Sequence, residues 1–138
     1  STTLFGNYIY YMGQRENDDE MKMYRRSLLS NSEQELSGVV GLIKGSIAVA
    51  DYNNDGNIDL LIAGNLFTSE VETPRNDAGN GLMLIGNGDG TFKAKARKET
   101  GFFAPSDAKK LSLIKINDQQ GVIVGNNNDL MQYFKRIE

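Results

Sequence analysis

Nine residues, Asp51–Asp59, have the spacing of a loop that holds a hard cation. Counting Asp51 as position 1, side chains that carry a ligand oxygen fall at positions 1, 3, 5 and 9. These are Asp51, Asn53, Asp55 and Asp59. Alternate residues of a tight loop point inward, the backbone carbonyl of Asn57 fills the gap at position 7, and Gly56 at position 6 permits the sharp turn. The pattern therefore predicts a metal site in this loop.

The predicted ligands favour calcium over other metals. They supply only oxygen, and hard cations such as Ca²⁺ take oxygen ligands, whereas softer metals prefer sulfur and nitrogen. We therefore expect one Ca²⁺ per chain in the loop Asp51–Asp59. The alternative is a turn that binds nothing, because Asn, Asp and Gly are favoured in turns for conformational reasons alone.

The residues on either side of the loop predict a β-hairpin and exclude an EF-hand. An EF-hand carries a glutamate at loop position 12, and Ile62 stands there in this sequence. The loop instead joins two short apolar runs, Ile47–Ala50 and Leu60–Ala63, which are typical of buried strands.

Composition removes several classes of function. The chain has 138 residues, enough for one domain, and it contains no histidine and no cysteine. Serine-hydrolase triads, thiol catalysis and nearly all zinc sites therefore lack their usual residues. The net charge of −3, with scattered Lys and Arg, gives no basic patch for nucleic acid. No apolar run approaches the roughly 18 residues that cross a bilayer.

A four-stranded unit is visible over residues 45–98. Its strands are predicted at 45–50, 58–65, 81–86 and 91–96. A long polar loop, 67–80, separates the second strand from the third, and a tight turn, Asn87–Gly90, joins the last two. The last strand alternates apolar and polar residues, which indicates a half-buried outer edge.

Two further stretches repeat this order less completely. In 101–138 we predict strands at 111–116, 122–126 and 130–134, and in 1–44 strands at 8–13 and 20–25, with a short fourth strand within 27–40. The segment Asn117–Gly121, which takes the place of the calcium loop in the last unit, is too short and too poor in carboxylates to cage a cation. The chain therefore divides into a partial unit (1–44), a complete unit with the calcium loop (45–98) and a degenerate C-terminal unit (101–138).

Repeated four-stranded antiparallel units predict an all-β fold of the β-propeller type. Propellers typically have four to eight blades, and this chain supplies roughly two to two and a half, so it is incomplete as a closed propeller. Repeat proteins do not tolerate an uncovered apolar face well. We therefore expect either further blades in a longer parent chain or association of copies through the open blade faces.

The segment 45–61 resembles the core of FG-GAP/VCBS repeats, the propeller blades of integrin α-subunit heads and of many secreted bacterial proteins. Gly86–Phe92 is similar to the turn that leads into the outer strand of these blades. The stretch 70–103 resembles the C-terminal blades of secreted Bacteroidetes-type VCBS-repeat proteins. The resemblance implies a calcium-stabilised propeller that is exported from the cell. It also implies Ca²⁺ ligands at Asp51, Asn53, Asp55 and Asp59 through side chains and at Asn57 through its carbonyl.

Together these features predict a non-catalytic calcium-binding module of an exported or cell-surface protein. Its role would be adhesion, glycan or protein binding, or scaffolding, with the loop 67–80 as a candidate contact surface. The alternative is part of a propeller-based polysaccharide lyase or hydrolase, because carboxylate pairs can perform acid–base catalysis without histidine. Glu70 and Glu72 are the candidate pair for that chemistry.

Overall fold

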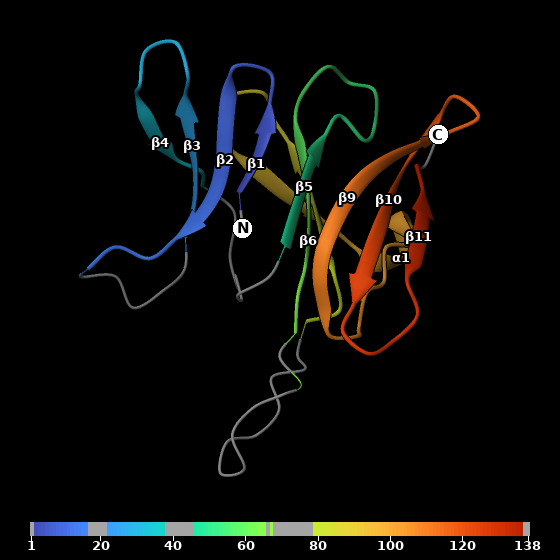
Figure 1. Cartoon of the computed structure of the whole chain (residues 1–138). Helices are drawn as coiled ribbons and strands as arrows, with labels where there is room; N and C mark the ends of the chain where they lie inside the picture. Colours follow the sequence, from blue (N-terminus) through green and yellow to red (C-terminus); the bar gives the residue numbers. More distant parts are fainter. Residues whose placement is uncertain (1, 17–21, 38–45, 66, 68–78, 137–138) are drawn as a thin grey trace.

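Antiparallel strands make up most of the chain. The computed structural model is described for residues 2–16, 22–37, 46–65, 67 and 79–136. Within these residues the strands form three separate sheets, of four, four and three strands, and no sheet closes on itself (Figure 1). The predicted all-β class is confirmed at this level.

The first sheet is a complete sheet of four strands, whereas only three strands were predicted in this part of the chain. It consists of β1 (Thr2–Phe5), β2 (Tyr8–Gly13), β3 (Lys22–Ser27) and β4 (Glu33–Glu35), paired in chain order. β1 was not predicted, because four residues are too few to show an alternating pattern. A turn at Gly6, with φ of 55°, joins β1 to β2.

The second sheet carries the candidate metal loop. Its strands are β5 (Ser46–Ala50), β6 (Asp59–Ala63), β7 (Leu82–Gly86) and β8 (Phe92–Lys95), again paired in chain order. The predicted hairpin around the loop is confirmed, since β5 and β6 pair with Ala50 opposite Asp59. β8 is an edge strand, as predicted, but it is less buried than its alternating pattern indicated, since only Phe92 is partly buried and the other three residues are exposed.

A helical turn, α1 (Arg97–Thr100), leads to the third sheet. The Glu99 carboxylate accepts a hydrogen bond from the amide of Ala96 at 3.0 Å, which caps the first turn of the helix. Gly101, with φ of 64°, ends it. The third sheet has strand order β11–β10–β9, with β9 at Ala108–Ile116, β10 at Gln119–Asn126 and β11 at Gln132–Lys135.

The second sheet is buried on both faces, which explains its continuous apolar runs. Ile47 and Val49 of β5 pack toward the first sheet, in a cluster with Tyr10 and Met23. The alternate residues Ala48 and Ala50 pack toward the third sheet, in a cluster with buried residues of β9 and β10. Neighbouring residues of a strand point to opposite faces, so a strand between two sheets must be apolar at every position.

The first strands of the three sheets lie next to one another. β5 contacts both β1 and β9, and Figure 1 shows these three strands side by side at the centre of the molecule. A parallel bridge between Ser37 and Thr91 also links the end of the first sheet to the β7–β8 turn. The β5–β6 loop and the β7–β8 turn both lie at the upper end of the sheets in this view.

Candidate functional site

The candidate metal loop is held by hydrogen bonds from its own amides. Asp51 accepts from the amides of Asp55 at 3.2 Å and Gly56 at 3.0 Å, one on each carboxylate oxygen. Asp55 accepts from the amide of Asn57 at 2.7 Å and from the side chain of Asn53 at 2.8 Å. These bonds fold four of the five predicted positions into one tight turn, in which Gly56 has φ of 85°.

Asp59 differs from the other predicted ligands because it is fully buried. One of its carboxylate oxygens accepts from the amide of Tyr52 at 2.8 Å and the other from the amide of Gly86 at 3.0 Å. It therefore connects the start of the loop to the neighbouring β7–β8 turn. This structural role was not predicted from the sequence, because Gly86 lies 27 positions away.

The electrostatics of the loop reflect three neighbouring carboxylates. Burial raises the pKa of Asp59, the amides of Gly86 and Tyr52 oppose this shift, and the charges of Asp55 and Asp51 add to it. By contrast, hydrogen bonds from Asn57 and Asn53 lower the pKa of Asp55. Within the described residues none of the three aspartates forms a salt bridge with Lys or Arg. The loop therefore concentrates negative charge that no described basic side chain neutralises.

The side chains of the loop do not converge on one point. Among the described residues, no three His, Cys, Asp or Glu side chains are arranged as a group that could hold a metal ion. The chemistry of the donors suits calcium, since all of them are oxygen. The carboxylate oxygens of Asp51 and Asp55 are turned toward loop amides and not toward a common metal position.

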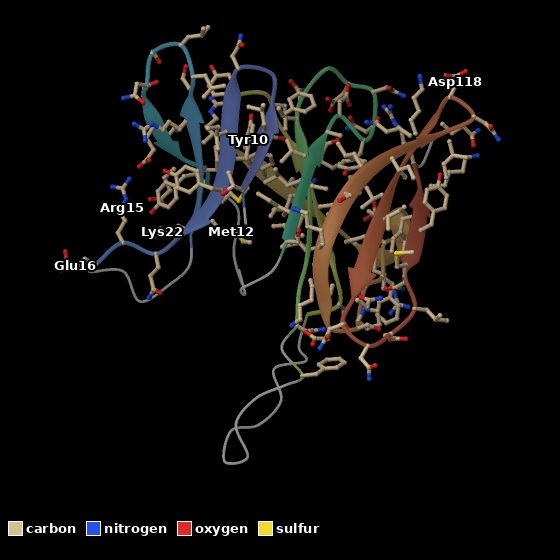
Figure 2. The ribbon with its side chains drawn as sticks, in the orientation of Figure 1. Tyr10, Met12, Arg15, Glu16, Lys22 and Asp118 are labelled. Carbon is tan, nitrogen blue, oxygen red and sulfur yellow. The ribbon has the colours of Figure 1, made fainter. Side chains whose placement is uncertain are left out.

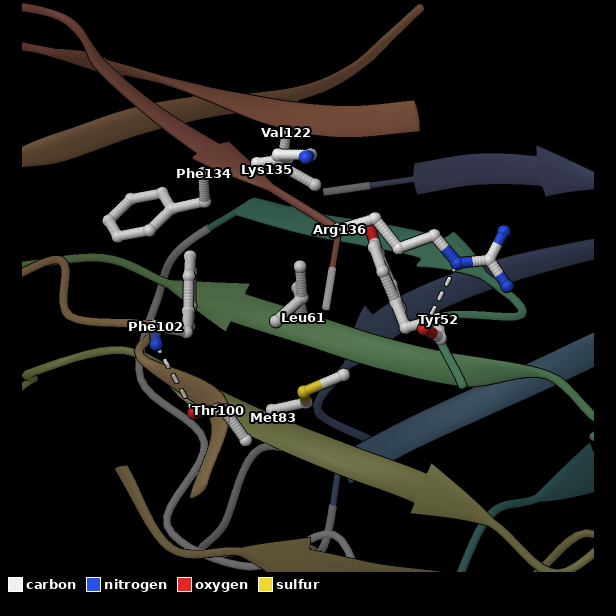
Figure 3. A pocket seen from close by; sticks show the side chains of 9 residues that line it. All are labelled: Tyr52, Leu61, Met83, Thr100, Phe102, Val122, Phe134, Lys135 and Arg136. Carbon is white, nitrogen blue, oxygen red and sulfur yellow. Dashed lines mark hydrogen bonds between the residues drawn. The ribbon is translucent and has the colours of Figure 1, made fainter. Parts of the chain in front are cut away.

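Tyr52 fixes the loop to the core between the second and third sheets. Its ring is buried and lines a small cavity of about 30 Å³ together with Leu61, Met83 and Phe134 (Figure 3). Arg136, at the end of β11, donates from Nε to the Tyr52 carbonyl at 3.1 Å. The cavity has room for about one or two water molecules, so it is a packing feature and not a ligand pocket.

The corresponding loop of the third sheet is a tight turn. Asn117 and Asp118 have φ of 49° and 63°, and β10 begins at the next residue. Asp118 lies at the exposed tip of this hairpin and pairs with Lys115 at 2.9 Å (Figure 2). The prediction that this segment is too short for a cation cage agrees with the two-residue turn.

The candidate acid–base pair, Glu70 and Glu72, and most of the candidate contact loop, 67–80, lie outside the described residues. In the part of the chain that the structure describes, no helix is long and apolar enough to span a membrane.

A buried polar network that was not predicted joins the second and third sheets. The Asn65 side chain donates to the carbonyls of Gly79, at 2.6 Å, and Pro105, at 2.8 Å. Asp107, also buried, accepts from Lys109 and from Asn127. Apart from Lys109, which lies two positions from Asp107, these partners are 14 to 40 positions apart in sequence, so no local pattern could have identified them.

No protein-family model matches the chain, and neither the curated proteins nor the solved structures gave a significant match.

Proposed function

We propose that the chain is a calcium-binding, non-catalytic module of an exported protein, in which a single Ca²⁺ stabilises the β5–β6 loop. The observation that supports this most is the group of carboxylates Asp51, Asp55 and Asp59. Asp51 and Asp55 belong to one hydrogen-bonded turn and Asp59 binds the amide of Tyr52 in the same loop, so their negative charges repel one another, and no described Lys or Arg forms a salt bridge with them. A divalent cation would remove this repulsion.

Binding would require small rearrangements of exposed side chains. Asp51 and Asp55 would turn from the loop amides toward a common point, with Asn53 and the Asn57 carbonyl completing the oxygen ligands. Asp59 would keep its bonds to Tyr52 and Gly86 and present its remaining lone pairs. The loop backbone, with Asn54 and Gly56 at positive φ, already follows a tight path.

The proposed role of the metal is structural. A ligand that binds only the folded state adds about 2.7 kcal/mol when its concentration exceeds the dissociation constant a hundredfold. Extracellular calcium modules often have dissociation constants of about 10⁻⁴ to 10⁻³ M, which match the calcium outside cells. We therefore place the module outside the cell, where it would contribute to adhesion, to glycan or protein binding, or to a scaffold.

We further propose that the three sheets are blades of a β-propeller. The adjacent first strands β1, β5 and β9 and the face-to-face packing of successive sheets support this arrangement. Closure would need further blades from a longer parent chain or from another copy. Sedimentation at several concentrations would distinguish self-association from a monomer.

The calcium proposal is tested by melting temperature and titration calorimetry on chelator-stripped protein. We expect one Ca²⁺ per chain, much weaker binding of Mg²⁺, and a rise in melting temperature with Ca²⁺. Asp55→Ala should abolish that rise. Asp118→Ala, a turn aspartate of the third sheet, is the matched control and should keep it. A wild-type melting temperature that changes neither with Ca²⁺ nor with chelator would reject calcium binding.

A further inference from the structure

A second candidate site lies between the first and second sheets, beside the metal loop. It is an open groove of about 180 Å³. Tyr10 and Arg25 of the first sheet form one wall, and Asn57, Thr91 and Phe92 of the second sheet form the other. Because Asn57 belongs to the loop between β5 and β6, the groove and the candidate metal site share one edge.

The first wall presents a fixed positive charge. The Nε and Nη2 atoms of Arg25 both donate to Oε1 of Gln34, at 2.9 and 2.7 Å. The guanidinium also lies over the ring of Tyr8, 5.0 Å from its centroid. These contacts hold Arg25 in one orientation, which lowers the entropy that a ligand would have to remove on binding.

Tyr10 adds a hydroxyl to the same wall. Its ring is buried, and burial raises the pKa of the hydroxyl, while nearby Arg25 acts in the opposite direction. Arginine is only a donor, so the contact with Arg25 leaves the Tyr10 proton available for another acceptor. Arg25 and Tyr10 thus both offer donors to whatever occupies the groove.

The floor of the groove is backbone, because glycines occupy alternate positions of the β7–β8 turn. A Cβ on Gly88 would lie 2.5 Å from Oδ1 of Asn57, and one on Gly90 would lie 2.6 Å from Nε2 of Gln34. Both glycines also have positive φ, of 84° and 94°. Any other residue would therefore displace a side chain that shapes the groove.

The lining and the size of the groove define the class of ligand. Among the described residues that line it, Arg25 is the one that carries a charge, so a carboxylate would be favoured at the first wall, on the side away from the metal loop. Pockets for drug-sized molecules have roughly 300–1,000 Å³, so this groove suits a smaller ligand, about one sugar ring. The aromatic edge of Phe92 and the amide of Asn57 would meet the apolar face and the hydroxyls of such a ring.

We propose that this groove binds a sugar acid, with its carboxylate at Arg25 and Tyr10 and its ring between Phe92 and the glycine turn. The inference rests on the proposed binding role of the module and specifies its ligand.

Titration of ¹⁵N-labelled protein with glucuronate, followed by amide chemical shifts, tests the proposal. The expected shifts are confined to the groove, at Gly88, Gly90 and Thr91. Glucose, which lacks the carboxylate, should bind at least about tenfold more weakly, since charge-assisted hydrogen bonds contribute about 1.4 kcal/mol or more. Acetate, which lacks the ring, should also bind more weakly than glucuronate.

Two variants locate the binding. Arg25→Gln should weaken binding of glucuronate about tenfold or more, and Tyr10→Phe, which keeps the buried ring, should weaken it by a smaller factor. Arg97→Gln removes an exposed arginine outside the groove, on α1, and should leave binding unchanged. The result for Arg25→Gln is interpreted only if the amide spectrum of this variant keeps the dispersed signals of a folded protein. Otherwise the result for Tyr10→Phe decides whether the ligand binds in the groove.

Equal binding of glucose or acetate, shifts outside the groove, or no effect of Tyr10→Phe would overturn the assignment. The titration is carried out in Ca²⁺ and in chelator. Absence of glucuronate binding together with an intact calcium-dependent melting temperature would reject the sugar site and leave the calcium module standing.

Discussion

The carboxylate of Asp59 accepts a hydrogen bond from the amide of Gly86 at 3.0 Å, and this bond ties the end of the metal loop to the β7–β8 turn. The close approach is possible because residue 86 has no side chain. A Cβ at Gly86 would overlap the carbonyl oxygen of Ile58, the residue before Asp59. The two residues therefore depend on each other: the glycine permits the approach, and the aspartate satisfies the buried amide.

Replacement of Asp59 tests this structural role separately from metal binding. We predict that Asp59→Ala lowers the free energy of unfolding by about 2–4 kcal/mol in the presence of chelator. It leaves the buried amides of Tyr52 and Gly86 without their acceptor, at about 1–3 kcal/mol for each unsatisfied group. Urea denaturation measures the loss, and Asp118→Asn, which removes the charge of an exposed aspartate and suits its positive φ, should cost less than about 0.5 kcal/mol. Equal stability of the two variants would contradict the role of Asp59.

Gly86 and Gly125 form a matched pair of strand glycines with opposite surroundings. We predict that Gly86→Ala destabilises the protein by about 1–3 kcal/mol or more, because the new methyl group meets backbone that cannot move aside. Gly125→Ala meets its nearest atom, the Lys110 carbonyl oxygen, at 3.7 Å, an ordinary contact. Its stability should therefore stay within about 0.5 kcal/mol of wild type. Similar losses in thermal melts of both variants would contradict the close approach at Gly86.

Local patterns predicted the second sheet well. The runs Ile47–Ala50 and Leu60–Ala63 are apolar at every position because sheets cover both faces of β5 and β6. The hairpin turn between them followed from the spacing of Asn, Asp and Gly. In the third sheet the predicted strands also correspond to β9, β10 and β11, although β9 and β10 each begin three residues earlier than expected and β11 begins two residues later.

Features that depend on distant partners were not predictable from the sequence. The short strand β1 carries no pattern of its own and forms by pairing with β2. The buried state of Asp59 depends on Gly86, and the groove depends on Arg25 approaching a turn more than 60 positions away. Loop spacing identified the possible ligands, but not that Asp51 and Asp55 turn toward loop amides.

Asp107 makes the stability of the junction between the second and third sheets dependent on pH. Burial alone would raise the pKa of this carboxyl, but hydrogen bonds from Lys109 and Asn127 and the charge of Lys109 outweigh it and lower the pKa. A carboxyl whose pKa is lower in the folded state than in the unfolded state stabilises the protein at pH values above its unfolded-state pKa, which is about 4 for aspartate. This contribution is lost as the pH falls below that value. We therefore predict that Asp107→Asn is less stable than wild type at pH 7 and that the difference narrows between about pH 4 and pH 2.5. Melting temperatures of both proteins over this range measure it. A difference that stays constant down to pH 2.5 would show that Asp107 contributes through packing rather than through its charge.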